Sequence, residues 1–114
     1  MSLIYKLLAA SEWASALAVG RFEGSAVDLA DGFIHFSAAD QAGETARRYF
    51  RGQEDVVLLV VETRTLGEAL RWEVSRGGGL FPHLYGPLAC RHVIEVRPAP
   101  LGDDGVPDLG RLSP

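Results

Sequence analysis

Apolar residues form several short, unbroken runs along the chain, which is the pattern of β-strands. Val56–Val61 is six apolar residues in a row, four of them valine, and predicts a strand that is buried on both faces. Ile4–Leu8 predicts another strand near the start of the chain. Shorter strands are expected at four further places: Phe33–Phe36, Leu70–Val74, Leu80–Tyr85 and His92–Arg97.

Two helices are expected between the first strands. The first covers about Ser11–Val19, with a serine as N-cap and Gly20 as the terminating residue. The second covers about Ala38–Phe50, because Ser37 and Asp40 have the spacing of a capping box.

Three stretches interrupt these patterns. Arg21–Leu29 is expected to be irregular, and Arg76–Gly79, with three successive glycines, to be a flexible loop. Beyond Pro98 the prolines mix with glycine and aspartate, so residues 99–114 are expected to form a loosely attached strap or a disordered end. The chain is therefore divided into one domain at residues 1–98 and a tail at 99–114. The order of elements predicts an α+β fold, with two helices packed on a small mixed or antiparallel sheet.

The composition of the chain excludes several classes of protein and of binding site. The 114 residues, 47% of them hydrophobic, suit one domain with one core, and the net charge of −4 lacks the basic excess of duplex nucleic-acid binders. The single cysteine, Cys90, excludes an internal disulfide and a multi-cysteine metal site. No signal-peptide pattern is present, and no apolar run approaches the roughly 20 residues that span a bilayer. We expect a cytoplasmic protein with no duplex nucleic-acid partner and no membrane association.

The first candidate site lies at the end of the predicted strand Phe33–Phe36. Side-chain alternation places His35 and Ser37 on one face, where an imidazole and a hydroxyl could hydrogen-bond one polar ligand. The helix that follows would offer unpaired N–H groups to an anionic group. The alternative is a half-buried histidine bonded to a backbone carbonyl, with Ser37 only capping the helix. The residues alone leave both interpretations open.

The second candidate site is an aromatic strand. Alternation places Phe81, His83 and Tyr85 on one face, which suits stacking on a flat ring and hydrogen bonding at its edge. The preceding triple glycine would allow close backbone approach to a ligand or a lid-like motion. The alternative is an aromatic strand that packs on a helix.

Charged residues near these segments add two further candidates. Arg71 and Glu73 share a strand face, where they could form a cross-strand ion pair, or Glu73 could bind a ribose hydroxyl or act as a base. His35 and His83 could converge with Asp31 or Glu73, but their spacing matches no metal-binding motif. No metal is expected.

Four segments together resemble the domain of unknown function 952 family. They are Ile4–Leu7, Asp31–Ser37, Leu70–Glu73 and Phe81–Leu88, and the resemblance covers about residues 3–98. It implies the ADP-ribosyltransferase-like fold, in which NAD lies in a cleft between two small sheets.

The same resemblance implies roles for individual residues. In the poly-ADP-ribose polymerase type of that superfamily, a histidine-x-serine or histidine-x-threonine segment binds the riboses of NAD, and a tyrosine commonly stacks on the nicotinamide. His35 would then be a ribose ligand, Ser37 a nicotinamide-side ligand and Tyr85 the stacking residue. Glu73 lies on an earlier strand than the superfamily's catalytic glutamate. The related RNA 2′-phosphotransferases use arginines and a histidine, and Arg71 and Arg91 could take such parts.

Three functions remain open at this point. The first is an enzyme of the ADP-ribosyl-transfer or phosphotransfer type that uses NAD or an ADP-ribosylated substrate, with Glu73 or His83 polarising a hydroxyl. The second is a non-catalytic module that binds a nucleotide or another metabolite, and the third is an interaction domain with a surface of Phe36, Phe81 and Tyr85. We expect a small nucleotide-like ligand and a monomer or weak dimer. The candidate ligand-binding residues are His35, Ser37, Phe81, Tyr85, Arg71 and Asp31.

Overall fold

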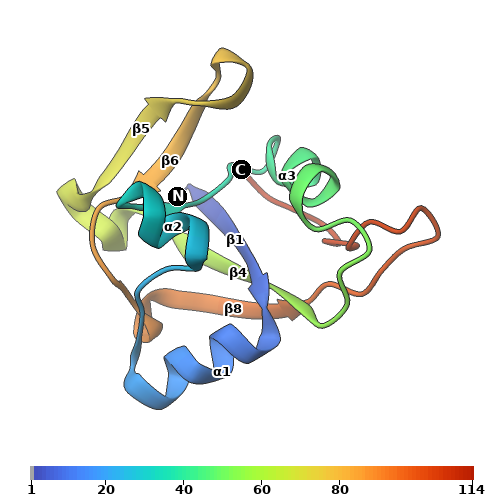
Figure 1. The fold of residues 1–114 in the computed structure, drawn as a ribbon. Helices are drawn as coiled ribbons and strands as arrows, with labels where there is room; N and C mark the ends of the chain where they lie inside the picture. The colour runs from blue at the N-terminus through green and yellow to red at the C-terminus, as the bar shows by residue number, and fades with distance from the viewer. Residues whose placement is uncertain (1) are drawn as a thin grey trace.

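A three-stranded antiparallel sheet with the order β1–β4–β8 crosses the molecule (Figure 1). The structure is a computed structural model that describes residues 2–114. β1 (Leu3–Ala9) pairs with β4 (Val56–Glu62) so that Tyr5 lies opposite Val60, and β8 (Val93–Pro98) pairs with the other edge of β4. The strands predicted at these three places are confirmed.

A second antiparallel sheet, β3–β6–β5, stands beside the first (Figure 1). β5 (Leu70–Val74) and β6 (Leu80–Leu84) form a hairpin, and β3 (Ile34–His35) pairs with the inner edge of β6. Two backbone hydrogen bonds of 2.8 Å between Tyr5 and Ser37 join β1 to the segment that follows β3. The α+β class with antiparallel strands is therefore correct, and the strands are split between small sheets.

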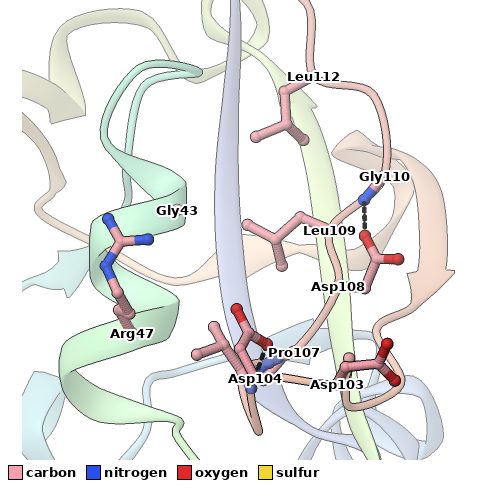
Figure 2. A pocket seen from close by; sticks show the side chains of 11 residues that line it. Gly43, Arg47, Asp103, Asp104, Pro107, Asp108, Leu109, Gly110 and Leu112 are labelled. Atoms are coloured by element: carbon pink, nitrogen blue, oxygen red, sulfur yellow. Dashed lines mark hydrogen bonds between the residues drawn. The ribbon is translucent and has the colours of Figure 1, made fainter.

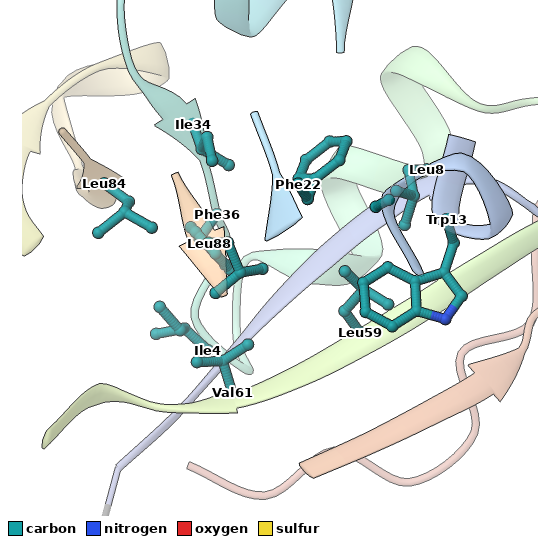
Figure 3. Packing of buried hydrophobic residues seen from close by; sticks show 11 residues of the cluster. Ile4, Leu8, Trp13, Phe22, Ile34, Phe36, Leu59, Val61, Leu84 and Leu88 are labelled. Atoms are coloured by element: carbon teal, nitrogen blue, oxygen red, sulfur yellow. The ribbon is translucent and has the colours of Figure 1, made fainter. Parts of the chain in front are cut away.

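β1 and β4 are covered on both faces, because alternate residues of each strand enter two different apolar clusters. The first cluster also takes side chains from α1 (Ala10–Val19) and from the two-stranded sheet of β2 (Arg21–Phe22) and β7 (Leu88–Ala89) (Figure 3). Its buried members are Ile4, Leu8, Trp13, Ala16, Phe22, Ile34, Phe36, Leu59, Val61, Leu84 and Leu88. The prediction that the valine-rich run is buried on both faces is confirmed.

The second cluster lies on the opposite face and includes the C-terminal segment. Val106 and Leu109 are each 7% exposed and pack with residues of β1, β4 and α3 (Ala42–Tyr49). The Tyr5 hydroxyl donates to the carbonyl of Ser113 at 2.6 Å. The expectation of a loose or disordered end is therefore wrong, since a few apolar residues among the prolines anchor this segment to the core.

One helix was missed in the sequence. α2 (Ala26–Asp31) occupies part of the stretch expected to be irregular, and Ser25 and Asp28 form a capping box at its start, with the Ser25 N–H donating to Asp28 at 2.8 Å. Its apolar side chains Val27 and Leu29 are exposed, whereas Asp28 is buried. No apolar stripe marks this helix, because the residue that it buries is charged.

The start of the second predicted helix is also wrong. α3 begins at Ala42, and no capping box forms at Ser37, whose hydroxyl bonds Thr45 at 2.8 Å instead. The side chain of Gln41 accepts from the Ala38 N–H at 2.9 Å. Residues 39–41 form a turn that separates Ser37 from the start of α3.

Short 3-10 helices complete the chain at Thr63–Ala69, Arg76–Gly78 and Cys90–His92. The second of these occupies the expected glycine loop, and it is broken at Gly77, whose φ of 71° suits glycine. Among residues 2–114, no helix is both long enough and apolar enough to cross a bilayer.

Candidate functional site

A cleft of about 450 Å³ opens between α2, α3 and the tip of the β5–β6 hairpin. This volume lies in the range of small-molecule sites. Three of the predicted site residues, Arg71, Glu73 and Tyr85, do not line it. The predicted residues that do line it are Asp31, His35, Ser37, Phe81 and His83.

Asp28 is the centre of a buried hydrogen-bond network whose other members, Lys6, Ser25 and His35, line the cleft. Its side chain is 1% exposed and accepts from Lys6 Nζ at 3.1 Å, His35 Nδ1 at 2.6 Å and the Ser25 N–H at 2.8 Å. Burial alone would raise the pKa of Asp28, but the bonds from His35, Lys6 and Ser25 outweigh it and lower the pKa to about 2. Burial lowers the pKa of Lys6 more than the Asp28 carboxylate raises it. The network therefore holds Asp28 as an anion.

His35 is bonded through both ring nitrogens. Nδ1 contacts Asp28 at 2.6 Å, and Nε2 contacts Asp31 at 2.9 Å. Both ring nitrogens of His35 are therefore occupied by carboxylate oxygens. A ligand that uses Nε2 of His35 must first displace the Asp31 side chain, which is 48% exposed.

His83 is bonded through one ring nitrogen. Its Nδ1 contacts Glu73 Oε1 at 2.8 Å, and the Tyr85 hydroxyl donates to the same oxygen at 2.8 Å. These bonds, the one from His83 first, lower the pKa of Glu73. The Arg71 guanidinium lies 4.8 Å from the centre of the Tyr85 ring. Glu73 on β5 therefore has a cross-strand partner in His83 on β6, whereas Arg71 forms no ion pair with a carboxylate of residues 2–114.

Phe33 holds the two imidazoles together from one side. Its ring stacks on His83 at 4.1 Å between centroids and lies 4.6 Å from His35, while the two imidazoles are 5.5 Å apart, edge to face. The Tyr85 ring is 5.2 Å from the same phenylalanine. The two histidine-bearing strands therefore converge, as their pairing in β3 and β6 requires.

A chain of polar contacts leads from Ser37 to Arg76 along the α3 side of the cleft. Ser37 bonds Thr45, and Nη2 of Arg76 donates to the same Thr45 hydroxyl at 3.3 Å. The Arg76 guanidinium lies 4.9 Å from the Phe81 ring centre and 5.6 Å from that of Tyr49. Among residues 2–114 it forms no ion pair with a carboxylate. A cation without a carboxylate partner thus lies between two aromatic rings in the cleft.

The comparisons with known proteins agree with this fold. Residues 7–96 match the family described as "Protein of unknown function (DUF952)". The chain belongs to the DUF952 family. It is similar to the X-ray structure of protein CC0527 from Caulobacter crescentus, with 60% identity and a TM-score of 0.92 over 94% of each chain. The solution NMR structure of CC0527 gives 61% identity and a TM-score of 0.85, over 94% of this chain and 92% of that one. No curated protein matches significantly.

Several residues of the cleft in this DUF952 domain were not predicted. They are Lys6, Thr45, Tyr49 and Arg76, and the buried Asp28, which bonds Lys6 and His35 of the cleft, was also missed. Lys6 carried a usable signal, since it is a lone charge within the apolar run of β1 and so had to find a buried partner. Arg76 was not predicted because the glycines that follow it indicate a loop, although loops on a rigid scaffold often carry functional residues.

The proposed interaction surface of the DUF952 domain does not form. Phe36 is 2% exposed and belongs to the first apolar cluster, whereas Tyr85 is 38% exposed. A partner could not contact both rings without opening the core. The hypothesis of a docking surface made of Phe36, Phe81 and Tyr85 is therefore wrong.

A second depression, of about 590 Å³, lies between α3 and the C-terminal segment (Figure 2). Three of its four charged side chains are already used locally: Asp104 accepts from the Val106 N–H, Asp108 accepts from the Gly110 N–H, and Arg47 is bonded to Glu44. The cleft beside His83 is therefore the better candidate site. Within residues 2–114, no group of three or more His, Cys, Asp or Glu side chains is arranged to hold a metal ion.

Proposed function

We propose that the cleft of this domain binds a small anionic molecule with a flat ring, of the nucleotide class, and that NAD and ADP-ribose are the first ligands to test. The observation that carries the proposal is Arg76, which lies in the cleft between Tyr49 and Phe81 and forms no ion pair with a carboxylate of residues 2–114. A phosphate would supply the missing anion, and the two rings would offer stacking faces.

The chemistry of arginine supports a phosphate as the anion. The guanidinium has a planar fork of donors that matches two phosphate oxygens, and its only hydrogen bond within residues 2–114 is the one to Thr45 at 3.3 Å. Gly77 and Gly78 follow it with positive φ angles of 71° and 83°, which glycine adopts without strain. Arg76 therefore lies at the start of the tight turn that connects β5 to β6.

The segment His35–Ser37 supports the choice of NAD among nucleotides. It resembles the ribose-binding segment of the ADP-ribosyltransferase-like folds, and both of its polar side chains line the cleft. The Thr45 hydroxyl links Ser37 and Arg76, because it bonds both the Ser37 hydroxyl and the Arg76 guanidinium. A ribose at His35 and Ser37 would thus place an attached phosphate near Arg76.

Isothermal titration calorimetry and thermal unfolding with NAD, ADP-ribose and nicotinamide test the proposal. A ligand at a hundredfold excess over its Kd should stabilise the protein by about 2.7 kcal/mol. The Arg76→Ala variant should bind at least tenfold more weakly, because a hydrogen bond to a charged group contributes about 1.5–3 kcal/mol. Arg48→Ala is the matched control, since that arginine is exposed and bonded to Glu44. If none of the three ligands binds, the choice of NAD-type ligands is wrong.

Binding and turnover are separated by one incubation. If the domain is an enzyme of the ADP-ribosyl-transfer type, free nicotinamide accumulates when NAD is left with the protein overnight. If it is a binding module, NAD binds and stays intact. The two outcomes distinguish the catalytic function from the non-catalytic alternative for the same cleft.

A further inference from the structure

The Glu73–His83 pair leaves one reactive nitrogen inside the cleft. His83 is 4% exposed, and its Nδ1 is held by Glu73 at 2.8 Å. Nε2 forms no hydrogen bond with any of residues 2–114, although the ring lines the cleft. Among these residues, the one fully enclosed side-chain nitrogen or oxygen without a partner is Glu62 Oε1. Nε2 of His83 therefore keeps contact with the open space of the cleft.

The protonation of this imidazole follows from its partner. The pKa of Glu73 is lowered, so at neutral pH its carboxylate is ionised and only accepts hydrogen bonds. Nδ1 of His83 must then be the donor. In the neutral ring the other nitrogen, Nε2, carries the lone pair. The bond to Glu73 thus selects the tautomer whose basic nitrogen faces the cleft.

The surroundings fix the ring in this orientation. Phe33 stacks on His83 with an interplanar angle of 27°, and the Tyr85 hydroxyl holds the Glu73 oxygen that accepts from Nδ1. The neighbouring His35 cannot play the same part, because both of its nitrogens are bonded to carboxylates. The arrangement of carboxylate, imidazole and unpartnered nitrogen is the one that general bases use, with the carboxylate stabilising the imidazolium that forms.

We propose that His83 is a general base that acts on a hydroxyl group of a molecule bound in the cleft, with Glu73 as its positioning residue. The hydroxyl O–H bond breaks, its proton moves to Nε2, and the electron pair stays on the oxygen. The substrate class is a hydroxyl-bearing molecule with an anionic group for Arg76, such as a sugar phosphate. This inference rests on the proposed binding cleft but not on the ligand being NAD.

Nitrogen-15 NMR of the histidine side chains in the full chain tests the tautomer directly. At a pH at which the imidazole is neutral, the Nδ1 signal of His83 should be that of a protonated nitrogen and Nε2 that of a nitrogen with a lone pair. The variant His83→Gln assigns these signals. Glu73→Ala should redistribute the proton between the two nitrogens, whereas Glu95→Ala, which removes a carboxylate bonded to Arg97, should leave the His83 signals unchanged. A wild-type His83 with its proton on Nε2 would overturn the proposal.

Diethyl pyrocarbonate measures whether the basic nitrogen can be reached. The lone pair attacks a carbonyl carbon of the reagent, a nitrogen–carbon bond forms, and ethyl carbonate leaves and decomposes to ethanol and carbon dioxide after taking up a proton. Peptide mapping should show His83 labelled at least tenfold faster than His35, with His92 as the internal reference. An unlabelled His83 beside a fully labelled His92 would overturn the proposal. Neither measurement uses NAD, so failure of NAD to bind leaves this result interpretable.

Discussion

His35 and His83 face each other across the β3–β6 pair with ring centres 5.5 Å apart, and each bonds a carboxylate through Nδ1. The partner of His35 is the buried Asp28, and the second nitrogen of the ring is bonded to Asp31. The partner of His83 is the partly exposed Glu73, and its second nitrogen has no partner within residues 2–114. Both ring nitrogens of His35 are thus hydrogen-bonded, whereas only one ring nitrogen of His83 is hydrogen-bonded within residues 2–114.

The difference teaches that a histidine–carboxylate pair alone does not mark a reactive site. Around Asp28 every polar group is satisfied, which ties α2 to β1 and β3. Around His83 the carboxylate is also satisfied, but the imidazole keeps one hydrogen-bonding position for a ligand. We therefore assign structure to the Asp28 network and chemistry to the Glu73–His83 pair.

Replacing Asp28 should have the largest effect. Asp28→Ala leaves the Lys6 ammonium, which is 7% exposed, buried without its carboxylate. Breaking a buried ion pair in this way costs about 3–5 kcal/mol of the free energy of unfolding. Urea unfolding followed by circular dichroism measures the loss. The exposed Asp40 is the control, and Asp40→Ala should change the stability by less than about 0.5 kcal/mol. Equal effects of the two substitutions would remove the structural role of Asp28.

Replacing His35 and His83 one at a time should lower the free energy of unfolding by unequal amounts. His35→Gln weakens a 2.6 Å bond to a buried carboxylate and should cost about 1.5–3 kcal/mol of the free energy of unfolding. The carboxylate that His83 bonds, Glu73, is 36% exposed and can bond water instead, so the loss for His83→Gln should be smaller. Urea midpoints of both variants against the wild-type protein decide the order. A greater loss for His83→Gln would reverse the assignment of the two pairs.

Acid should weaken the Asp28 network in a defined range of pH. The pKa of Asp28 is about 2 in the folded protein and 3.8 in its ordinary state, so the folded form binds the proton less readily than the unfolded one. This difference contributes about 2 kcal/mol, which is present above pH 4 and is lost as the pH falls from about 4 to about 2. Urea unfolding at successive pH values should show this loss. The Asp28→Asn variant should lack this part of the slope, and an unchanged slope would contradict the assignment.

The sequence predicted the elements that hide apolar side chains and missed those that hide charges. The valine-rich strand β4 was located correctly, because its run of apolar residues is typical of a strand that is buried on both faces. α2 was missed because the residue that it buries is Asp28, while its apolar residues face solvent. Periodicity reports burial only where the buried side chains are apolar.

Part of the candidate site could likewise be predicted from local sequence patterns, and part could not. His35, Ser37, Phe81 and His83 could be placed near one cleft because alternation along two strands is a local rule. Which carboxylate each histidine bonds could not be predicted, since Asp28 and Glu73 reach them through the pairing of β3 with β6 and the position of α2. Arg76 depends on a contact with α3 that no local pattern encodes.

Removing the Tyr85 hydroxyl should have the smallest effect of these substitutions, and it should change the Glu73–His83 pair but not the Asp28 network. Tyr85→Phe deletes the second donor to Glu73 Oε1 and leaves the bond from His83 in place. The pKa of Glu73, lowered first by His83 and then by Tyr85, should rise part of the way to its ordinary value, so the carboxylate takes up a proton at a higher pH during acid titration. Carbon-13 NMR of the Glu73 carboxyl measures the midpoint. Tyr49→Phe is the control, since that hydroxyl makes no bond to Glu73. If the midpoint does not move, Tyr85 does not help to hold the carboxylate, and Glu73 positions His83 through their shared bond alone.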